Sequence, residues 1–237
     1  MPREQSLYNR PLPGARLNMA HPIARDIQGC WLLNEQMGLR AMDLSPYANH
    51  GILTNFPDGQ RAFNGLLFDG SNDFVSIAHE GRLGPDFATL EAIFIPAALS
   101  AGHSICSKGY VGGAPRAYRI LIDTDQVYFE MSTDGTNAPS VSSGSATAVA
   151  GRFYHCIGTY DGAIVRFYWE GRQTSTVSAA GTMAKNTEAL QIGRDRTVNY
   201  FSGSIFLVRL WRRAISAWEV AALVASPYKP LGIPMFL

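Results

Sequence analysis

The chain has 237 residues, of which 46% are hydrophobic and 16% are charged, and its formal net charge is +1. This composition supports a large buried core, and the length suits a single all-β domain. The near-neutral charge provides no field to attract nucleic acid or an anionic membrane, which excludes both as expected partners. No run approaches the roughly 18 apolar residues of a membrane span. The first residues lack the apolar core of a signal peptide, so we expect synthesis and maturation in a cytoplasm.

Three cysteines, Cys30, Cys106 and Cys156, occur without CxxC spacing. Cys30 precedes a tryptophan and Cys156 lies in an apolar run, which is typical of small buried residues. We therefore expect three free thiols and a reducing compartment.

Residues 1–21 predict an extended N-terminal arm. Dense proline excludes a helix and a central strand in this segment. Apolar side chains nevertheless recur through the arm, at Leu7, Tyr8, Leu12, Leu17 and Met19. Such an arm lies either against its own domain or against a neighbouring subunit, and the sequence leaves both alternatives open.

Short β-rich runs separated by turn residues follow the arm. In residues 127–132, Val, Phe and Met alternate with Tyr, Glu and Ser, which is the period of a strand with two different faces. Residues 140–151 predict an edge strand and a loop. The other expected strands are residues 28–34, 66–68, 74–77, 89–95, 103–107, 117–122, 190–193 and 204–211.

Residues 151–177 predict a three-stranded antiparallel meander. Asp161-Gly162 between β-branched and aromatic runs indicates a hairpin with a type I′ turn, because glycine adopts positive φ without strain. Glu170-Gly171 is a weaker signal of the same kind.

One short helix is expected near the C-terminal end. Ser216 and Glu219 form the pattern of a capping box, and Ile215 and Val220 are spaced for a hydrophobic staple. Pro227 ends the helix. Residues 227–237 carry three prolines and apolar side chains, which predicts a second extended arm.

About a dozen short strands with a single short helix predict an all-β fold of two packed antiparallel sheets. In their order and spacing, nine segments resemble the concanavalin A-like jelly rolls of the laminin G-like superfamily, in particular the single-domain type found in phage and bacterial proteins. These segments are residues 29–35, 43–51, 67–75, 89–92, 153–162, 167–171, 190–193, 201–205 and 208–216. The resemblance implies one jelly-roll domain over residues 22–226, flanked by arms at 1–21 and 227–237.

The polar loop at residues 43–51 is where the resemblance implies a structural Ca²⁺ ion, with Asp43 and Asn49 as candidate ligands. Ca²⁺ takes about six to eight oxygen ligands, including carboxylates. In the family, a strand near the C-terminal end supplies a second carboxylate ligand. At the matching position this sequence has the apolar Phe206. The alternative is that Asp43, Ser45 and Asn49 stabilise the loop through Asx-turn hydrogen bonds. The sequence therefore predicts either no cofactor or a single structural Ca²⁺ ion.

Residue patterns for catalysis are missing from the sequence. The related jelly-roll glucanases use the pattern Glu-x-Asp-x-x-Glu on one strand, which this chain lacks. Asp123 and Asp125 flank an expected turn, and His155 reads as a packed strand residue with one hydrogen bond. We expect the protein not to be an enzyme.

Aromatic residues near loops are the candidates for stacking on a sugar ring, with nearby hydrogen-bond donors. The ligand-binding candidates are Tyr47, Tyr110, Trp169 and Tyr200, with Arg116 as a donor, and Tyr160 and Asn199 are weaker candidates.

Two functions are compatible with these features. The segments 21–31 and 226–230 resemble phage and prophage reading frames, which implies a non-catalytic virion component, such as a decoration or appendage protein. On this view the arms bind other particle subunits, and the protein is made in the bacterial cytoplasm and located at the particle surface. The alternative is a carbohydrate-binding, lectin-like module for adhesion or receptor recognition, with Ca²⁺ as a potential aid.

Overall fold

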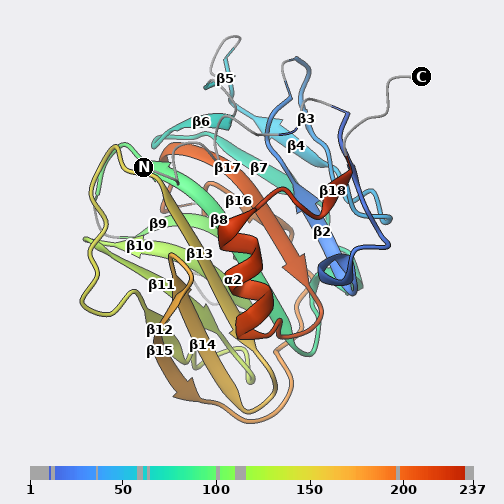
Figure 1. Ribbon diagram of the computed structural model, residues 1–237. Coiled ribbons are helices and arrows are strands. Elements are labelled where there is room, and N and C mark those ends of the chain that lie inside the picture. The colour runs from blue at the N-terminus through green and yellow to red at the C-terminus, as the bar shows by residue number, and fades with distance from the viewer. Residues whose placement is uncertain are drawn as a thin grey trace.

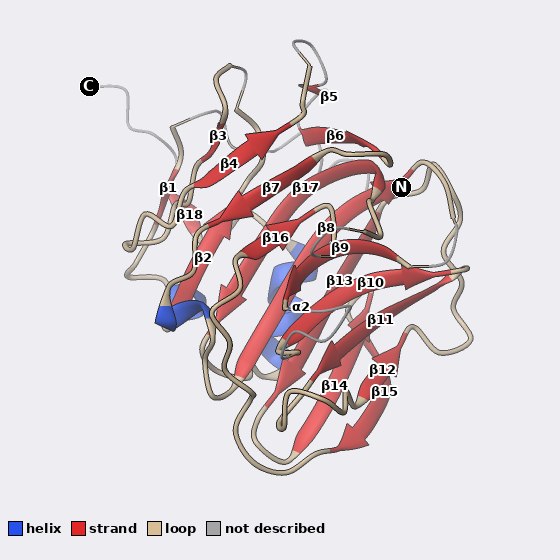
Figure 2. Cartoon of the chain, turned by 180° about the vertical axis from the view of Figure 1, so that it is seen from behind, coloured by secondary structure: helices blue, strands red, loops and turns tan. Residues whose placement is uncertain are grey.

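The structure is a computed structural model, and it describes residues 11, 14–35, 37–57, 61–62, 65–99, 102–109, 116–195 and 198–232. Two antiparallel sheets pack face to face (Figures 1 and 2), as the sequence predicts. We call them the covered sheet and the open sheet.

The covered sheet has its outer face packed against a helix, and β2 (Ile27–Trp31) pairs with its strand β17. Its remaining strands are, in spatial order, β15 (Arg172–Ser178), β14 (Ile164–Trp169), β13 (Tyr154–Tyr160), β8 (Ala88–Pro96), β17 (Ser202–Trp211), β6 (Gly65–Asp69) and β5 (Arg61–Ala62).

The open sheet has strands with one buried face and one partly exposed face, as in the strictly alternating burial of β11. Its strands are, in spatial order, β12 (Ser140–Ser142), β11 (Gln126–Met131), β10 (Tyr118–Asp123), β9 (His103–Lys108), β16 (Leu190–Ile192), β7 (Phe74–Ile77), β4 (Gly51–Thr54) and β3 (Arg40–Ala41).

The main core lies between the two sheets. It contains large side chains from both, including Trp31, Phe94, Tyr118 and Phe129, all fully buried. Gly158 on β13 faces Phe129, whose ring occupies the space where a Cβ would lie. The aromatic-rich inner faces of the two sheets thus interdigitate, which fixes how one sheet is placed on the other.

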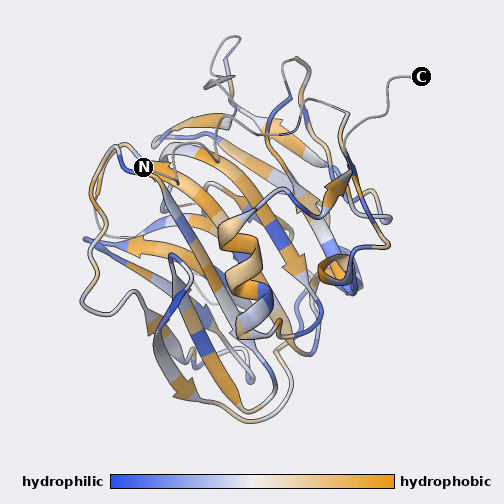
Figure 3. Cartoon of the chain, in the orientation of Figure 1, coloured by the Kyte–Doolittle hydropathy of each residue, from blue (hydrophilic) through white to orange (hydrophobic). Residues whose placement is uncertain are grey.

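A second core covers the outer face of the covered sheet. There α2 (Ala217–Ala225) lies across the central strands in both Figure 1 and Figure 2. Val220 and Leu223 of α2 pack with Ile93, Ile157 and other apolar residues of the sheet. Hydrophobic residues run along α2 and the strands beneath it (Figure 3). Because its central strands are buried on both faces, β13 is buried at every position rather than at alternate ones.

The described parts of the two arms pair with each other. β1 (Arg16–Leu17) and β18 (Leu231–Gly232) form a two-stranded antiparallel ribbon. Ala15, Leu17 and Leu231 are buried in the second core. The described residues of both arms therefore pack against the chain's own domain, which is one of the two alternatives that the sequence left open. Residues 1–10 and 233–237 lie outside the described residues.

The predicted helix is confirmed together with its capping box. The Ser216 hydroxyl accepts a hydrogen bond from Glu219 N, and the Glu219 carboxylate accepts one from Ser216 N. Each predicted strand is present, with ends shifted by at most a few residues.

Of the two type I′ turns predicted in the meander, the one with the weaker signal is confirmed and the other is wrong. At Glu170-Gly171 both residues have positive φ (54° and 83°), and Trp169 pairs with Arg172, which defines a two-residue type I′ turn. The predicted type I′ turn at Asp161-Gly162 is wrong, because Asp161 is not at positive φ and the last pair is Tyr160 with Val165. Asp161 Oδ1 instead accepts two backbone hydrogen bonds within a longer loop, as an Asx turn does.

All three cysteines are free and buried, as expected. Burial raises the pKa of the Cys30 thiol to about 12, so this thiol stays protonated and unreactive. No helix in the described part of the chain is long and apolar enough to cross a membrane.

Candidate functional site

A cleft of about 640 Å³ opens at one end of the sandwich. One wall is the segment that follows β12, residues 143–147 and 152–154. The other wall is the β14–β15 turn, residues 169–174. The meander predicted from the sequence therefore supplies most of the cleft.

Two stacked aromatic rings form the base of the cleft. The rings of Trp169 and Tyr154 lie 4.6 Å apart between centroids, with an interplanar angle of 29°. Trp169 is only 6% exposed, and Phe167 and Phe94 back the pair from the core. The Tyr154 hydroxyl accepts a hydrogen bond from Val149 N at 2.7 Å. Both rings are almost fully buried, with Tyr154 4% and Trp169 6% exposed, so neither offers a free aromatic face.

The type I′ turn fixes the second wall. Glu170 Oε1 accepts a hydrogen bond from His155 N at 2.9 Å, and Glu170 N donates to His155 O at 2.9 Å. A Cβ at Gly171 would lie 3.3 Å from Val224 of α2, so the turn sits close against the helix. Arg172 follows directly and is exposed at the mouth of the cleft.

Hydrogen bonds connect the first wall to β15, to the end of β8 and within its own segment. Thr174 Oγ1 donates to Ser142 O at 2.8 Å, which joins β15 to β12 across the two sheets. Ser143 Oγ donates to Ala146 O at 2.6 Å, and Gly151 N donates to Pro96 O at 2.7 Å. The cleft is therefore preformed, as most small-ligand sites are.

The rim of the cleft is polar and carries two arginines, Arg152 and Arg172, which are both exposed. Neither makes an ion pair with a carboxylate among the described residues. The other rim groups are the hydroxyls of Ser145, Thr147 and Thr174 and the amide of Gln173. This surface suits a hydroxylated ligand with negative charge, because guanidinium groups bind carboxylates in bidentate fashion.

Only one carboxylate, that of Glu170, lines the cleft among the described residues. Most glycosidases place two carboxylates on either side of the scissile bond. The described lining of the cleft therefore lacks the carboxylate pair that most glycosidases use.

The structure does not bring the predicted ligand residues together. Trp169 forms part of the cleft. Tyr47 is 41% exposed, with the guanidinium of Arg82 stacked 4.6 Å from its ring centroid. Tyr200 accepts a hydrogen bond from Arg194 at 3.3 Å in a separate cluster with Phe74.

Arg116 is exposed and is the first residue of the described segment 116–195. Tyr110 lies outside the described residues. The weaker candidate Tyr160 is buried, and its hydroxyl donates to Gly181 O at 2.7 Å.

Asp43 and Asn49 stabilise the polar loop through hydrogen bonds, which is the alternative to a Ca²⁺ site. Asp43 Oδ1 accepts hydrogen bonds from Cys30 N and Ser45 N, and Oδ2 accepts from Ser45 Oγ and Asn49 N. The Asn49 amide donates to Gln28 O and accepts from Arg82. Because both carboxylate oxygens already have two donors each, these residues do not fit a Ca²⁺ ion.

Phe206 also fails to contribute to a metal site. It is buried in the second core, 6.1 Å from the ring of Phe153 between centroids. No group of three metal-ligating side chains is present among the described residues.

A buried ionic network that no sequence pattern indicates lies under α2. Glu91 and Arg209 are fully buried, and Arg209 Nε lies 2.7 Å from Glu91 Oε2. His155, correctly predicted as a packed residue, lies 2.7 Å from Glu91 Oε1 through Nε2. Burial alone would raise the pKa of Glu91, but Arg209 and His155 outweigh it and lower this pKa. Glu91, His155 and Arg209 line neither the cleft nor the pocket beside α2.

A second buried carboxyl, Asp73, stands at the end of the loop that begins with Asp69. Its Oδ2 accepts a hydrogen bond from Asp69 N at 3.0 Å. Its Oδ1 has no hydrogen-bond partner among the described residues. Burial, assisted by the negative charge of Asp69, raises the pKa of Asp73 to about 6.

Asp73 is expected to make stability depend on pH. The usual carboxyl pKa is about 3.9, so between about pH 4 and pH 6 the folded chain binds more protons than the unfolded chain. The contribution of Asp73 to the free energy of unfolding therefore grows as the pH falls from neutral toward about 5. Asp73→Asn should abolish this gain in urea-unfolding measurements, whereas Asp123→Asn at the exposed end of β10 should retain it. An identical pH profile for wild type and Asp73→Asn would show that the raised pKa is wrong.

Comparisons with known proteins place this geometry in a family. A search of curated protein sequences gives no match. Among solved structures, the chain is similar to Trypanosoma rangeli sialidase in complex with sialic acid, with 17% identity and a TM-score of 0.64. The match covers 86% of this chain and 33% of the sialidase chain, so this chain spans about a third of that protein's length.

Two binding domains show the same fold. The Ruminococcus gnavus IT-sialidase CBM40 bound to α2,3-sialyllactose matches with 17% identity and a TM-score of 0.57, over 68% of this chain and 96% of that one. The binding domain of Paraclostridial Mosquitocidal Protein 1 matches with 10% identity and a TM-score of 0.64, over 87% and 53%. At these identities the matches show the fold alone.

The sequence itself matches a family model over residues 69–221, which is more than half of the chain. That segment contains the strands from β7 to β17, the first part of α2 and the whole of the cleft. The chain belongs to the concanavalin A-like lectin/glucanases superfamily.

Proposed function

We propose that this protein is a non-catalytic glycan-binding module whose ligand lies in the cleft between the segment after β12 and the β14–β15 turn. The observation that carries the proposal is the combination of a rigid aromatic base, a hydroxyl- and amide-rich rim, and two arginines without acidic partners among the described residues. Sites of this kind use a few placed polar groups to orient a ligand against an apolar base.

The proposed ligand class is an acidic oligosaccharide, with sialylated glycans as the first to be tested. The carboxylate of such a sugar would serve as the acidic partner of Arg152 and Arg172, and its hydroxyls would pair with Thr147, Gln173 and Thr174. Two of the structurally similar proteins contain sialic acid or sialyllactose, which supports the choice of probe.

Isothermal titration calorimetry with α2,3-sialyllactose and with neutral lactose tests this proposal. We expect the sialylated sugar to bind more tightly, and Arg172→Gln or Arg152→Gln to weaken it about tenfold or more, because a hydrogen bond to a charged group is worth about 1.5–3 kcal/mol. Arginine variants are preferred to Trp169 variants, since Trp169 is also a core residue.

Arg40→Gln serves as the matched control, because Arg40 is an exposed arginine on β3 of the open sheet, outside the cleft. It should leave the affinity unchanged. Equal affinity for lactose and sialyllactose would refute the acidic-sugar assignment. Failure to bind any member of a broad glycan array would refute the module function itself.

A structural role in a phage-like particle is the second candidate. It is supported by the resemblance of residues 21–31 and 226–230 to phage reading frames, while the described residues of the arms pair within the chain. Particle contacts would thus use surfaces other than the β1–β18 ribbon. Co-sedimentation with particles tests this role, and a protein that never associates with them does not have it.

A further inference from the structure

A second, mainly apolar pocket of about 350 Å³ lies between α2 and the 3₁₀ turn Pro22–Ala24. We call it the helix pocket. Its apolar wall includes Pro22, Ile23, Trp218 and Ala222, and His21 and Lys229 stand at its border. It lies on the outer face of the covered sheet and shares no lining residue with the glycan cleft.

Trp218 is 76% exposed, more than any other described aromatic side chain named among the exposed hydrophobic residues. It is the second residue of α2 and belongs to neither hydrophobic core. An exposed tryptophan beside an apolar pocket is typical of an interaction site, because tryptophan is enriched among the residues that contribute most to binding at protein interfaces.

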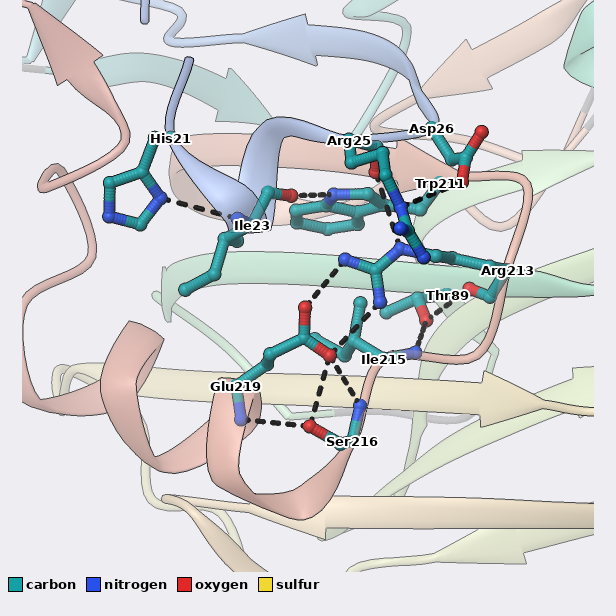
Figure 4. A network of polar contacts seen from close by, with 10 residues as sticks. All are labelled: His21, Ile23, Arg25, Asp26, Thr89, Trp211, Arg213, Ile215, Ser216 and Glu219. Carbon is teal, nitrogen blue, oxygen red and sulfur yellow. Dashed lines mark hydrogen bonds and ion pairs between the residues drawn. The ribbon is translucent and has the colours of Figure 1, made fainter. Parts of the chain in front are cut away.

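Hydrogen bonds connect the 3₁₀ turn, the start of α2 and the covered sheet around the helix pocket, as Figure 4 shows. Trp211 Nε1 donates to Ile23 O at 2.7 Å, which fixes the 3₁₀ turn on the covered sheet. Arg213 donates to both carboxylate oxygens of Glu219 and to Arg25 O, which links the start of α2 to the same turn. A preformed pocket loses little entropy on binding.

The chain offers an apolar segment beside this pocket. Residues 233–237 read Ile-Pro-Met-Phe-Leu and carry no charged side chain. They follow β18, whose last residue is only three positions after Lys229 at the border of the pocket. The direction of β18 decides whether the segment can reach the pocket of its own chain or that of a second copy of the chain.

β18 carries the chain away from its own helix pocket. Leu231 pairs with Leu17 and Gly232 with Arg16, so β18 runs toward the beginning of β1. The pocket residues His21, Pro22 and Ile23 lie beyond the opposite end of β1. At Gly232, the last described residue, the chain thus points away from its own pocket. Exchange of an identical segment between two copies is a low-cost route to a dimer.

We propose that the helix pocket binds residues 233–237 of a second copy of the chain. In a two-fold dimer each copy donates its segment and receives its partner's, so the contact is self-complementary and closes without forming a filament. The apolar side chains of the segment cover Trp218 and the wall formed by Ile23 and Ala222. This inference is independent of glycan binding.

Analytical ultracentrifugation of the full chain over a range of concentrations tests the proposal. We expect a monomer of 25.8 kDa to convert to a dimer as concentration rises. Trp218→Ala and a chain ending at Gly232 should each weaken dimerisation at least tenfold, the Trp218 change because a central aromatic anchor is worth about 2 kcal/mol or more. Ile52→Ala, which removes an exposed hydrophobic side chain of β4, should leave it unchanged.

The intrinsic tryptophan fluorescence gives a second readout, because Trp218 is exposed whereas the other three tryptophans are buried. It should shift with the monomer–dimer transition in the full chain, and the shift should be lost when residues 233–237 are removed. A full chain that stays monomeric at every concentration would overturn the proposal. A dimer that persists without residues 233–237, or a fluorescence change on their removal from a strictly monomeric chain, would overturn it as well.

Discussion

Replacing Arg209 by Met is expected to lower the free energy of unfolding by about 3–5 kcal/mol. Arg209 and Glu91 are both fully buried, and the guanidinium contacts both carboxylate oxygens, at 2.7 Å and 2.9 Å. Arg209 also donates to Pro227 O at 2.8 Å, which ties the end of α2 to β17. Removing the guanidinium leaves a buried carboxylate with His155 alone, and desolvation of that charge is no longer offset.

Urea unfolding followed by circular dichroism measures this effect. Arg212→Met is the matched control, because Arg212 is the exposed member of a surface pair with Asp26, and such pairs contribute about 0–1 kcal/mol. The double variant Glu91→Leu, Arg209→Met should recover much of the loss, since it removes both charges of this buried pair. A loss of less than about 1 kcal/mol for Arg209→Met alone would contradict the buried ion pair.

Gly203→Ala is expected to destabilise the fold by at least about 3 kcal/mol, from backbone strain and overpacking together. Gly203 has φ of 138°, and a Cβ there would lie 2.2 Å from Ile95 O and 2.8 Å from Ala97 N. Both neighbours are backbone atoms of the β8 end, so they cannot move aside as a flexible side chain would. The steric conflict lies between the two strands that form the centre of the covered sheet.

Thermal unfolding compares this variant with Gly81→Ala. A Cβ at Gly81 would have no atom within 4 Å, and Gly81 has no positive φ. The control should therefore unfold close to the wild-type temperature, while Gly203→Ala unfolds far below it or fails to fold. Equal stability of the two variants would show that β8 and β17 approach each other less closely than these distances require.

The sequence predicted the architecture well because local signals and the global fold agree. Ser216 and Glu219 marked the start of α2 within one residue, and the alternation in residues 127–132 marked a strand with one buried face. The turn at Asp161-Gly162 was misjudged because an aspartate side chain can bind backbone amides and stabilise a longer loop.

The candidate site was less predictable because it depends on contacts across the sheets. Trp169 was identified, but its partner Tyr154 and the rim residues Arg152 and Arg172 become a site only when β12 and β15 meet. Glu91 and Arg209 lie 118 positions apart, so no local pattern indicates their pairing.

The arms show the same limit. Their apolar residues were recognised, but only the pairing of Leu17 with Leu231 decides that the described residues fold back on the domain.

A titration of the ¹⁵N-labelled protein with α2,3-sialyllactose, followed by two-dimensional NMR, tests most directly whether the cleft is the glycan site. The account predicts that chemical-shift changes concentrate at residues 143–147 and 169–174, including the indole N–H of Trp169. Changes confined to the outer face of the open sheet around Arg194 and Tyr200, or no changes with any acidic glycan, would contradict it.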